Sequence, residues 1–114
     1  MRDLVRKFKA LSDPNRIRIL KMLEVRPLCV CEITEILKLA PSTVSKHLSI
    51  LRDADFILDE KDGKWVNYRL NEEQGSEQVK KLLPLIRAWL HEDQLVFSDL
   101  DRVLTLDRNE LCNV

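Results

Sequence analysis

The sequence has few glycines, prolines and aromatic residues. Of its 114 residues only 2 are Gly and 4 are Pro, and 5% are aromatic, whereas 45% are hydrophobic and 33% are charged. This composition excludes collagen-like, low-complexity and disordered chains. Because a domain most often has about 100–150 residues, the length leaves no room for a second folded domain. We expect one compact, helix-rich globular domain.

Long hydrophobic runs are also lacking. No apolar segment approaches the length of about 20 residues that a membrane-spanning helix requires, and the first residues lack the apolar core of a secretory signal. We therefore expect a cytoplasmic protein with no membrane partner.

Cysteine is scarce. Cys29, Cys31 and Cys112 cannot all pair within one chain, and a reducing cytoplasm disfavours disulfides in any case. We expect any function of these residues to depend on their thiolates.

Neither charge sign is in excess, since Lys and Arg together number 19, as do Asp and Glu. The two signs are nevertheless segregated along the chain. Residues 1–70 carry 14 basic and 10 acidic side chains, and residues 71–114 carry 5 basic and 9 acidic ones. The N-terminal part is therefore better suited to face DNA.

Hydrophobic spacing predicts a first helix over residues 2–11 and a second from Pro14 to just before Arg26. Asp13 is expected to cap the second helix, because its carboxylate can accept a free backbone N–H and Pro14 fits the first helical position. Three outward cations of this helix are expected to be solvated, with some phosphate contact: Arg16, Arg18 and Lys21.

The next two segments predict a helix-turn-helix. A short helix is expected over residues 28–37, a turn at 38–41 and a longer helix over 42–54. Apolar residues share one face of the longer helix: Val44, Leu48 and Leu51. Small polar and cationic residues project from the opposite face or lie beside it: Ser42, Thr43, Lys46 and Ser49. Such a face suits the major groove of DNA.

A hairpin is expected directly afterwards. Residues 56–61 and 64–70 flank Asp62-Gly63, a pair that type I′ turns favour because both positions tolerate positive φ. A hairpin after a helix-turn-helix is the wing of a winged helix. Lys61 and Lys64 at its tip suit phosphate contacts.

Helical spacing returns over residues 75–101, where we expect Pro84 to kink or interrupt the helix. The first and last helices offer more apolar surface than a three-helix core and hairpin can cover, so we expect them to pair across the two-fold axis of a homodimer. The expected fold is mainly α with a small β-hairpin: a winged helix-turn-helix over residues 1–104, dimeric through its N- and C-terminal helices, with a tail at 105–114.

Over residues 4–100 the chain resembles the arsenic- and metal-responsive ArsR/SmtB winged-helix repressors. Three motifs carry the resemblance: Leu28-Cys29-Val30-Cys31-Glu32-Ile33, Ser42-x-x-Ser45-x-His47-Leu48, and Gly63-Lys64-Trp65-Val66-x-Tyr68-Arg69-Leu70. The first is the most diagnostic, because it resembles the Leu-Cys-Val-Cys-Asp-Leu signature of arsenite-sensing members. Those members are dimers that bind an inverted-repeat operator and leave it when the ligand binds.

The resemblance implies a repressor of an arsenic-resistance operon, released from double-stranded operator DNA when As(III), or Sb(III), binds the thiolates of Cys29 and Cys31. We expect DNA contacts from eight residues: Ser42, Thr43, Ser45, Lys46, His47, Lys61, Lys64 and Arg69. His47 is expected to pack or to face a phosphate rather than to bind a metal. The sequence has no Gly-rich phosphate loop and no Cys-x-x-Cys redox spacing, so we expect no catalysis and no organic cofactor.

The sequence departs from the arsenite-sensing pattern at one position. Members with this signature typically carry a third cysteine three residues after the second, where this chain has Thr34. Cys112 would replace that ligand if the C-terminal tail folds back to the short helix of its own or the partner subunit. Cys112 is therefore a candidate third ligand, and an incidental cysteine is the alternative.

Two other interpretations stay open. In the first, the same fold senses Cd(II), Pb(II) or Zn(II), or a thiol oxidation that joins Cys29 and Cys31. Cadmium and lead sensors add a cysteine-containing arm, yet no cysteine precedes Cys29, and His91 has no second histidine nearby for a zinc site. In the second, the chain is a thiol-based metalloid-buffering or protein-interaction module that does not bind a specific DNA sequence.

The spacing of Cys29 and Cys31 has a mechanical consequence. Side chains at i and i+2 of an intact α-helix diverge by about 200°, so binding one small ion through both requires the start of the helix to unwind. Because this helix supports the helix over residues 42–54, which is the expected recognition helix, ligation is expected to weaken DNA binding, and DNA to weaken ligation equally. The nearby helix N-terminus is expected to favour the thiolate.

Overall fold

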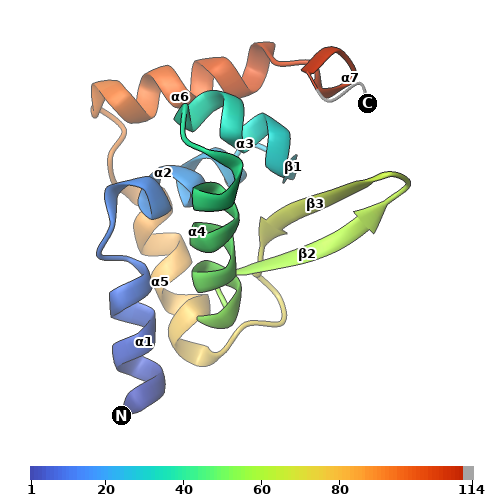
Figure 1. Cartoon of the computed structure of the whole chain (residues 1–114). Helices are drawn as coiled ribbons and strands as arrows, with labels where there is room; N and C mark the ends of the chain where they lie inside the picture. The colour runs from blue at the N-terminus through green and yellow to red at the C-terminus, as the bar shows by residue number, and fades with distance from the viewer. Residues whose placement is uncertain (112–114) are drawn as a thin grey trace.

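The computed structural model describes residues 1–111, which form a helical body with a small three-stranded sheet on one side (Figure 1). The elements follow in this order: α1 (Arg2–Ala10), α2 (Pro14–Leu23), β1 (Leu28–Cys29), α3 (Val30–Leu37), α4 (Pro41–Asp53), β2 (Ile57–Asp62), β3 (Trp65–Leu70), α5 (Glu77–Ala88), α6 (Gln94–Thr105) and α7 (Arg108–Leu111). The expected winged helix-turn-helix, mainly helical with a β-hairpin, is confirmed.

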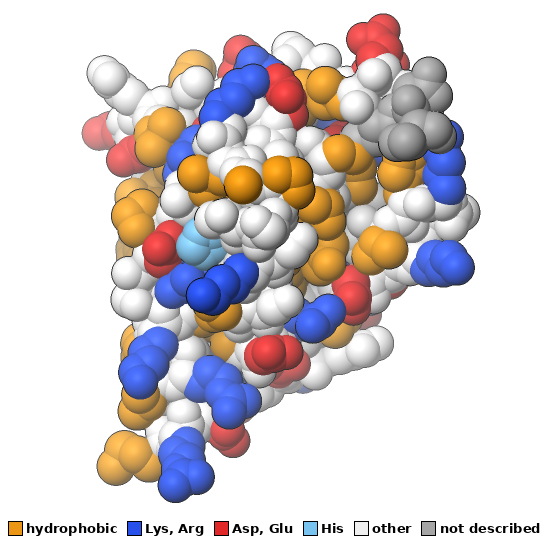
Figure 2. Space-filling model, viewed as in Figure 1, with side chains coloured by type: hydrophobic (Ala, Val, Ile, Leu, Met, Phe, Trp, Pro, Cys, Tyr) orange, Lys and Arg blue, Asp and Glu red, His pale blue; other side chains and the backbone are white. Residues whose placement is uncertain are grey.

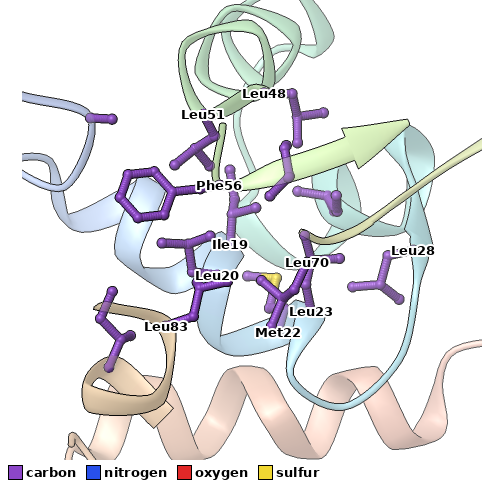
Figure 3. Close-up of a cluster of buried hydrophobic side chains, with 14 of the residues drawn as sticks. Ile19, Leu20, Met22, Leu23, Leu28, Leu48, Leu51, Phe56, Leu70 and Leu83 are labelled. Atoms are coloured by element: carbon purple, nitrogen blue, oxygen red, sulfur yellow. The ribbon is translucent and has the colours of Figure 1, made fainter. Parts of the chain in front are cut away.

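Helix α2 lies at the centre of the core, where it packs against α4, β3 and α6. Asp13 caps it as predicted, since the Asp13 carboxylate accepts hydrogen bonds from the backbone N–H groups of Asn15 and Arg16 at 2.8 and 3.3 Å. Figure 3 shows the buried side chains around this helix: Ile19, Leu20, Met22, Leu23, Leu28, Leu48, Leu51, Phe56, Leu70 and Leu83. This cluster fixes α4, the second helix of the helix-turn-helix, and the base of the wing to one core.

The prediction of a helix over residues 28–37 is wrong for its first two residues. Leu28 and Cys29 form a short strand that pairs antiparallel with Tyr68 and Asn67 of β3. Pro27 disfavours the helical region at its predecessor, and β3 offers its free edge to the next residues. Helix α3 therefore begins at Val30, and Cys29 becomes its N-cap with extended backbone angles, φ −88° and ψ 166°.

The hairpin is confirmed, but its predicted turn is shifted by one residue. Asp62 pairs with Trp65, so the two loop residues are Gly63 and Lys64 rather than Asp62 and Gly63. Gly63 has a φ of 60°, and Lys64 is not among the residues with positive φ. A loop with glycine in the first position and positive φ only there meets the requirement of a type II′ turn, which also matches the twist of the strands.

The C-terminal helical region breaks at a different place from the predicted one. Pro84 lies inside α5, and the interruption falls at residues 89–93 instead. There Leu90 has a φ of 69°, which an α-helix does not allow, and Asp93 caps α6 by accepting a hydrogen bond from the Val96 N–H at 3.0 Å. The expected C-terminal tail begins inside α6 and includes α7, which packs against α3.

Two of the three α2 cations that were expected to be solvated, Arg18 and Lys21, are instead paired with carboxylates. Arg18 forms a two-point ion pair with Asp99 of α6, at 2.8 and 3.0 Å. The side chain of Lys21 is only 2% exposed and pairs with Glu24 at 2.9 Å. Its Nζ also donates to the backbone carbonyls of Ile86 and Trp89 at 3.0 and 2.9 Å. Both cations therefore join α2 to the C-terminal helices.

Within residues 1–111, no helix is both long and apolar enough to cross a membrane.

We predict that Lys21→Met destabilises the protein by about 3 kcal/mol, because it leaves Glu24 and the last carbonyls of α5 without their buried cation. Urea unfolding at a fixed protomer concentration measures this. Lys80→Met, at an exposed position of α5, is the control and should change the free energy of unfolding by less than about 0.5 kcal/mol. Equal effects of the two substitutions would contradict a capping role for Lys21.

Candidate thiol site and nucleic-acid interface

The two nearby cysteines lie together where β1 meets α3. Cys29 ends the strand and Cys31 lies in the first turn of the helix, and their Sγ atoms are 3.1 Å apart. The extended backbone at Cys29 brings the sulfurs together, because Cys29 stands outside the helix. The expectation that the start of the helix must unwind to bring both sulfurs together is therefore wrong.

Cys29 and Cys31 line a cavity of about 580 Å³ between α3 and the wing. Its lining is largely apolar and comes from four parts of the chain: Cys29, Val30, Cys31, Thr34, Glu35, Pro41, Lys64, Trp65, Val66 and Leu111. Thr34 is part of this lining, and it stands at the position where the arsenite sensors that this chain resembles carry a third cysteine. Its Oγ1 is buried and has no hydrogen-bond partner among residues 1–111.

Burial controls the chemistry of Cys29. The residue is 2% exposed, and this burial raises the pKa of its thiol above the ordinary value. A hydrogen bond from the Glu32 backbone acts in the opposite direction, while the negative charge of the Glu32 carboxylate adds to the rise of the pKa. That carboxylate is itself buried, accepts from the Cys29 N–H at 3.1 Å and pairs with Arg26 at 2.8 Å. The expectation that the helix N-terminus favours the thiolate of Cys29 is thus overturned by burial.

Helix α7 covers one side of the cavity. The guanidinium of Arg108 lies 4.1 Å from the ring centre of Trp65. It also donates to the side-chain oxygens of Asn67 and Asp62, both at 3.0 Å. Leu111, at the end of the same helix, lines the cavity. Sequence reasoning missed this contact, since nothing local to Arg108 indicates a partner more than forty residues earlier.

Cys112, the candidate third ligand, lies outside the described residues. Within residues 1–111, no group of three or more His, Cys, Asp or Glu side chains is placed to hold a metal ion.

The predicted DNA-reading residues lie on one face of α4. Ser42, Thr43, Ser45 and Lys46 are exposed, while the predicted apolar stripe of Val44, Leu48 and Leu51 is buried. His47 is half-buried, and the Arg16 guanidinium donates toward its Nδ1 at 3.2 Å. His47 therefore points to α2, which agrees with a packing role.

The three wing residues that were predicted to contact DNA differ in whether their charge is already paired with a carboxylate. Lys61 and Lys64 are exposed and have no ion pair within residues 1–111. The Lys64 Nζ lies 4.9 Å from the ring centre of Trp65. Arg69 forms an ion pair with Glu60 on the neighbouring strand, so a phosphate would have to compete with this carboxylate.

We predict that Cys29 in the reduced, folded protein needs a higher pH for alkylation by iodoacetamide than the same residue in urea. The thiolate is the reactive form, and the raised pKa leaves a smaller thiolate fraction at neutral pH. Peptide mass spectrometry gives the rate against pH, and scaling to the high-pH plateau separates the pKa from access. An apparent pKa in the folded chain equal to or below that in urea would contradict this.

Comparison with known proteins agrees with the fold and the motifs. The family described as bacterial regulatory protein, arsR family, matches residues 13–58. The arsenical resistance operon repressor of Escherichia coli K12 is 41% identical over 105 residues, or 90% of this chain and 80% of the repressor. A cadmium resistance transcriptional regulatory protein, CadC homolog, of Staphylococcus aureus is 34% identical over 82% of this chain and 73% of its own length. The solved structure of HlyU from Vibrio cholerae N16961 is 31% identical with a TM-score of 0.63, over 75% of this chain and 89% of HlyU. This chain therefore belongs to the arsR family of bacterial regulatory proteins.

Proposed function

We propose that this chain represses an arsenic-resistance operon and leaves the operator when As(III), or Sb(III), binds Cys29 and Cys31. The observation that carries the proposal is the 3.1 Å separation of the two sulfurs at the start of α3. Members of the family are DNA-binding transcriptional regulators rather than enzymes, and the relative from Escherichia coli is an arsenical resistance operon repressor. We place the protein in the cytoplasm, where bacterial operators lie.

The chemistry of the site suits a soft, thiol-seeking ligand. One arsenous acid molecule and the two thiols form two As–S bonds and release two water molecules, which leaves one hydroxyl on arsenic. The two sulfurs start close together and in partial contact with the cavity, so this reaction requires little rearrangement of α3.

Cys112 is our candidate for the third ligand. Leu111 lines the same cavity as Cys29 and Cys31. Helix α7, which ends at Leu111, packs against α3, and this supports Cys112 as a candidate. The Cys112 thiol would form a third As–S bond and displace the remaining hydroxyl, which would leave as water.

The position of the cavity gives ligand binding two routes to the DNA-binding surface. Helix α3, which carries Cys31, packs on the recognition helix α4. The opposite wall is the wing, through Lys64, Trp65 and Val66. A ligand that binds the free conformation more tightly than the DNA-bound one weakens DNA binding by the factor by which DNA weakens ligand binding.

We expect the operator to be an inverted repeat bound by a homodimer. Large apolar side chains stay exposed on α1, on α5 and α6 and in the connection between them: Leu4, Phe8, Leu85, Trp89, Leu90, Leu95 and Phe97. Pairing these surfaces across a two-fold axis would remove them from water and present two α4 helices to major grooves about 34–36 Å apart.

A divalent-metal sensor is the second candidate function. The cadmium resistance relative from Staphylococcus aureus favours it, because that protein shares 34% identity with this chain. A ligand panel separates it from the arsenite proposal. The alternative of a metalloid-buffering or protein-interaction module is disfavoured, since the family consists of DNA-binding regulators.

We predict that As(III) releases the reduced protein from a fluorescently labelled fragment of an arsenic-operon promoter, followed by anisotropy. Titrations with Sb(III), Cd(II), Pb(II) and Zn(II) run in parallel. Cys29→Ser should bind the fragment normally and lose the response to As(III), because one of two required thiolates is gone. Cys112→Ser should weaken the response if Cys112 is a ligand and leave it unchanged if it is not. Release by a divalent metal alone would reject As(III) as the inducer.

We predict that Lys46→Ala weakens binding to the same fragment and reduces the slope of log K against log[salt] by about 0.9 per protomer, if Lys46 contacts one phosphate. Lys80→Ala is the matched control, because Lys80 is also exposed and lacks an ion pair within residues 1–111. Unchanged affinity and slope in Lys46→Ala would reject α4 as the recognition helix.

A further inference from the structure

The cations of this protein divide into two groups. Many are neutralised by carboxylates, as Arg18, Arg26, Arg87 and Arg102 are. Within residues 1–111, those without an ion pair are Arg2, Arg6, Lys7, Lys9, Arg16, Lys46, Lys61, Lys64 and Lys80. All of these but Lys80 lie on α1, the start of α2, α4 and the wing. Unneutralised positive charge is therefore concentrated around the recognition helix.

Helix α1 carries three of these cations on one face. Arg2, Arg6 and Lys9 are spaced i, i+4 and i+7, so their side chains project within about 60° of each other around the helix. All three are exposed. We call this set the α1 basic stripe. The acidic residue of this helix, Asp3, projects about 100° from the centre of the stripe.

The α1 basic stripe borders a groove that reaches the recognition helix. A hollow of about 560 Å³ is lined by Arg2, Arg6 and Lys9, together with Arg16 of α2 and Ile50 of α4. Figure 2 shows Lys and Arg side chains gathered from the middle of this face down to the end where α1 lies. The positive surface of α4 thus continues onto α1.

Helix α1, which carries the stripe, and the wing lie on different sides of α4 (Figure 1). Ile50 borders the groove beside α1, whereas Lys61 and Lys64 stand at the far end of the hairpin. A recognition helix in a major groove has a DNA backbone on each side. The wing is placed to reach one of these backbones, and α1 is placed to reach the other.

The opposite face of α1 has a separate role in the proposed dimer. Leu4 and Phe8 are 40% and 55% exposed and project roughly opposite the stripe. Pairing of this apolar face with a partner subunit would leave the basic stripe uncovered. Helix α1 would then contribute its apolar face to the dimer interface and keep its basic stripe exposed.

We propose that the α1 basic stripe binds DNA phosphates beside the major groove that α4 enters, as a second backbone clamp opposite the wing. The inference rests on the proposed docking of α4 and extends it to a helix outside the helix-turn-helix and wing. Phosphate contacts carry little sequence information, so the stripe adds affinity rather than base specificity.

The test compares two variants with the same loss of charge. Arg6→Gln/Lys9→Gln removes two cations from the stripe, and Lys80→Gln/Lys81→Gln removes two from α5. Binding to the labelled promoter fragment and to a duplex of unrelated sequence is measured by anisotropy over a series of salt concentrations. We expect the stripe variant to lower the slope of log K against log[salt] by about 1.8 per protomer on both duplexes, with the α5 variant close to wild type.

Further measurements separate the possible outcomes. Arg6→Lys/Lys9→Arg keeps the charges and should keep the slope, and circular dichroism and sedimentation check that the Gln variant still folds and dimerises. An unchanged slope in the stripe variant, with normal wild-type binding, overturns this inference and leaves the proposed function standing. Equal losses in the two Gln variants also overturn it, since net charge alone would explain them. Wild-type protein that binds neither duplex overturns the proposed function as well.

Discussion

The pairing of two residues in β1 with β3 is the constraint on which the thiol site depends. It holds Leu28 and Cys29 in an extended conformation beside Tyr68 and Asn67, so that α3 begins one residue after Cys29. Without this pairing the two cysteines would project from different sides of a helix. With it, their sulfurs lie 3.1 Å apart at the edge of a cavity whose other wall is the wing. The same few backbone contacts therefore position the two cysteines and connect them to the hairpin.

Much of this architecture follows from local sequence signals. Asp13-Pro14, the apolar stripe of α4 and the hairpin around Gly63 each depend on residues close together in the chain, and the structure contains all three. The errors arose where distant residues decide the outcome. Leu28 and Cys29 have the apolar spacing of a helix, yet the edge of β3, about forty residues later, pairs with them. The turn shifted because strand pairing at Asp62 and Trp65 overrides the preference of Asp-Gly for a type I′ loop.

The candidate site residues show the same division. The sequence motifs indicated Cys29 and Cys31 and the polar face of α4, because these candidate sites are defined by neighbours in the chain. They did not indicate that burial beside Glu32 would raise the pKa of the Cys29 thiol, or that Arg108 would lie over Trp65. The sequence also did not indicate which cations are paired with other groups. Arg18 and Lys21 look like surface charges in the sequence, and only the position of α5 and α6 shows that they are partnered within the core.

The stacking of Arg108 on Trp65 gives the molecule an internal optical reporter. The indole of Trp65 borders the thiol cavity on one side and the guanidinium of Arg108 on the other, so its surroundings change with anything that enters the cavity or displaces α7. The second indole, Trp89, lies in the connection between α5 and α6, away from the cavity lining. Intrinsic emission from Trp65 thus reports on the cavity beside Cys29 and Cys31, and emission from Trp89 reports on the helices that we expect to join the two subunits.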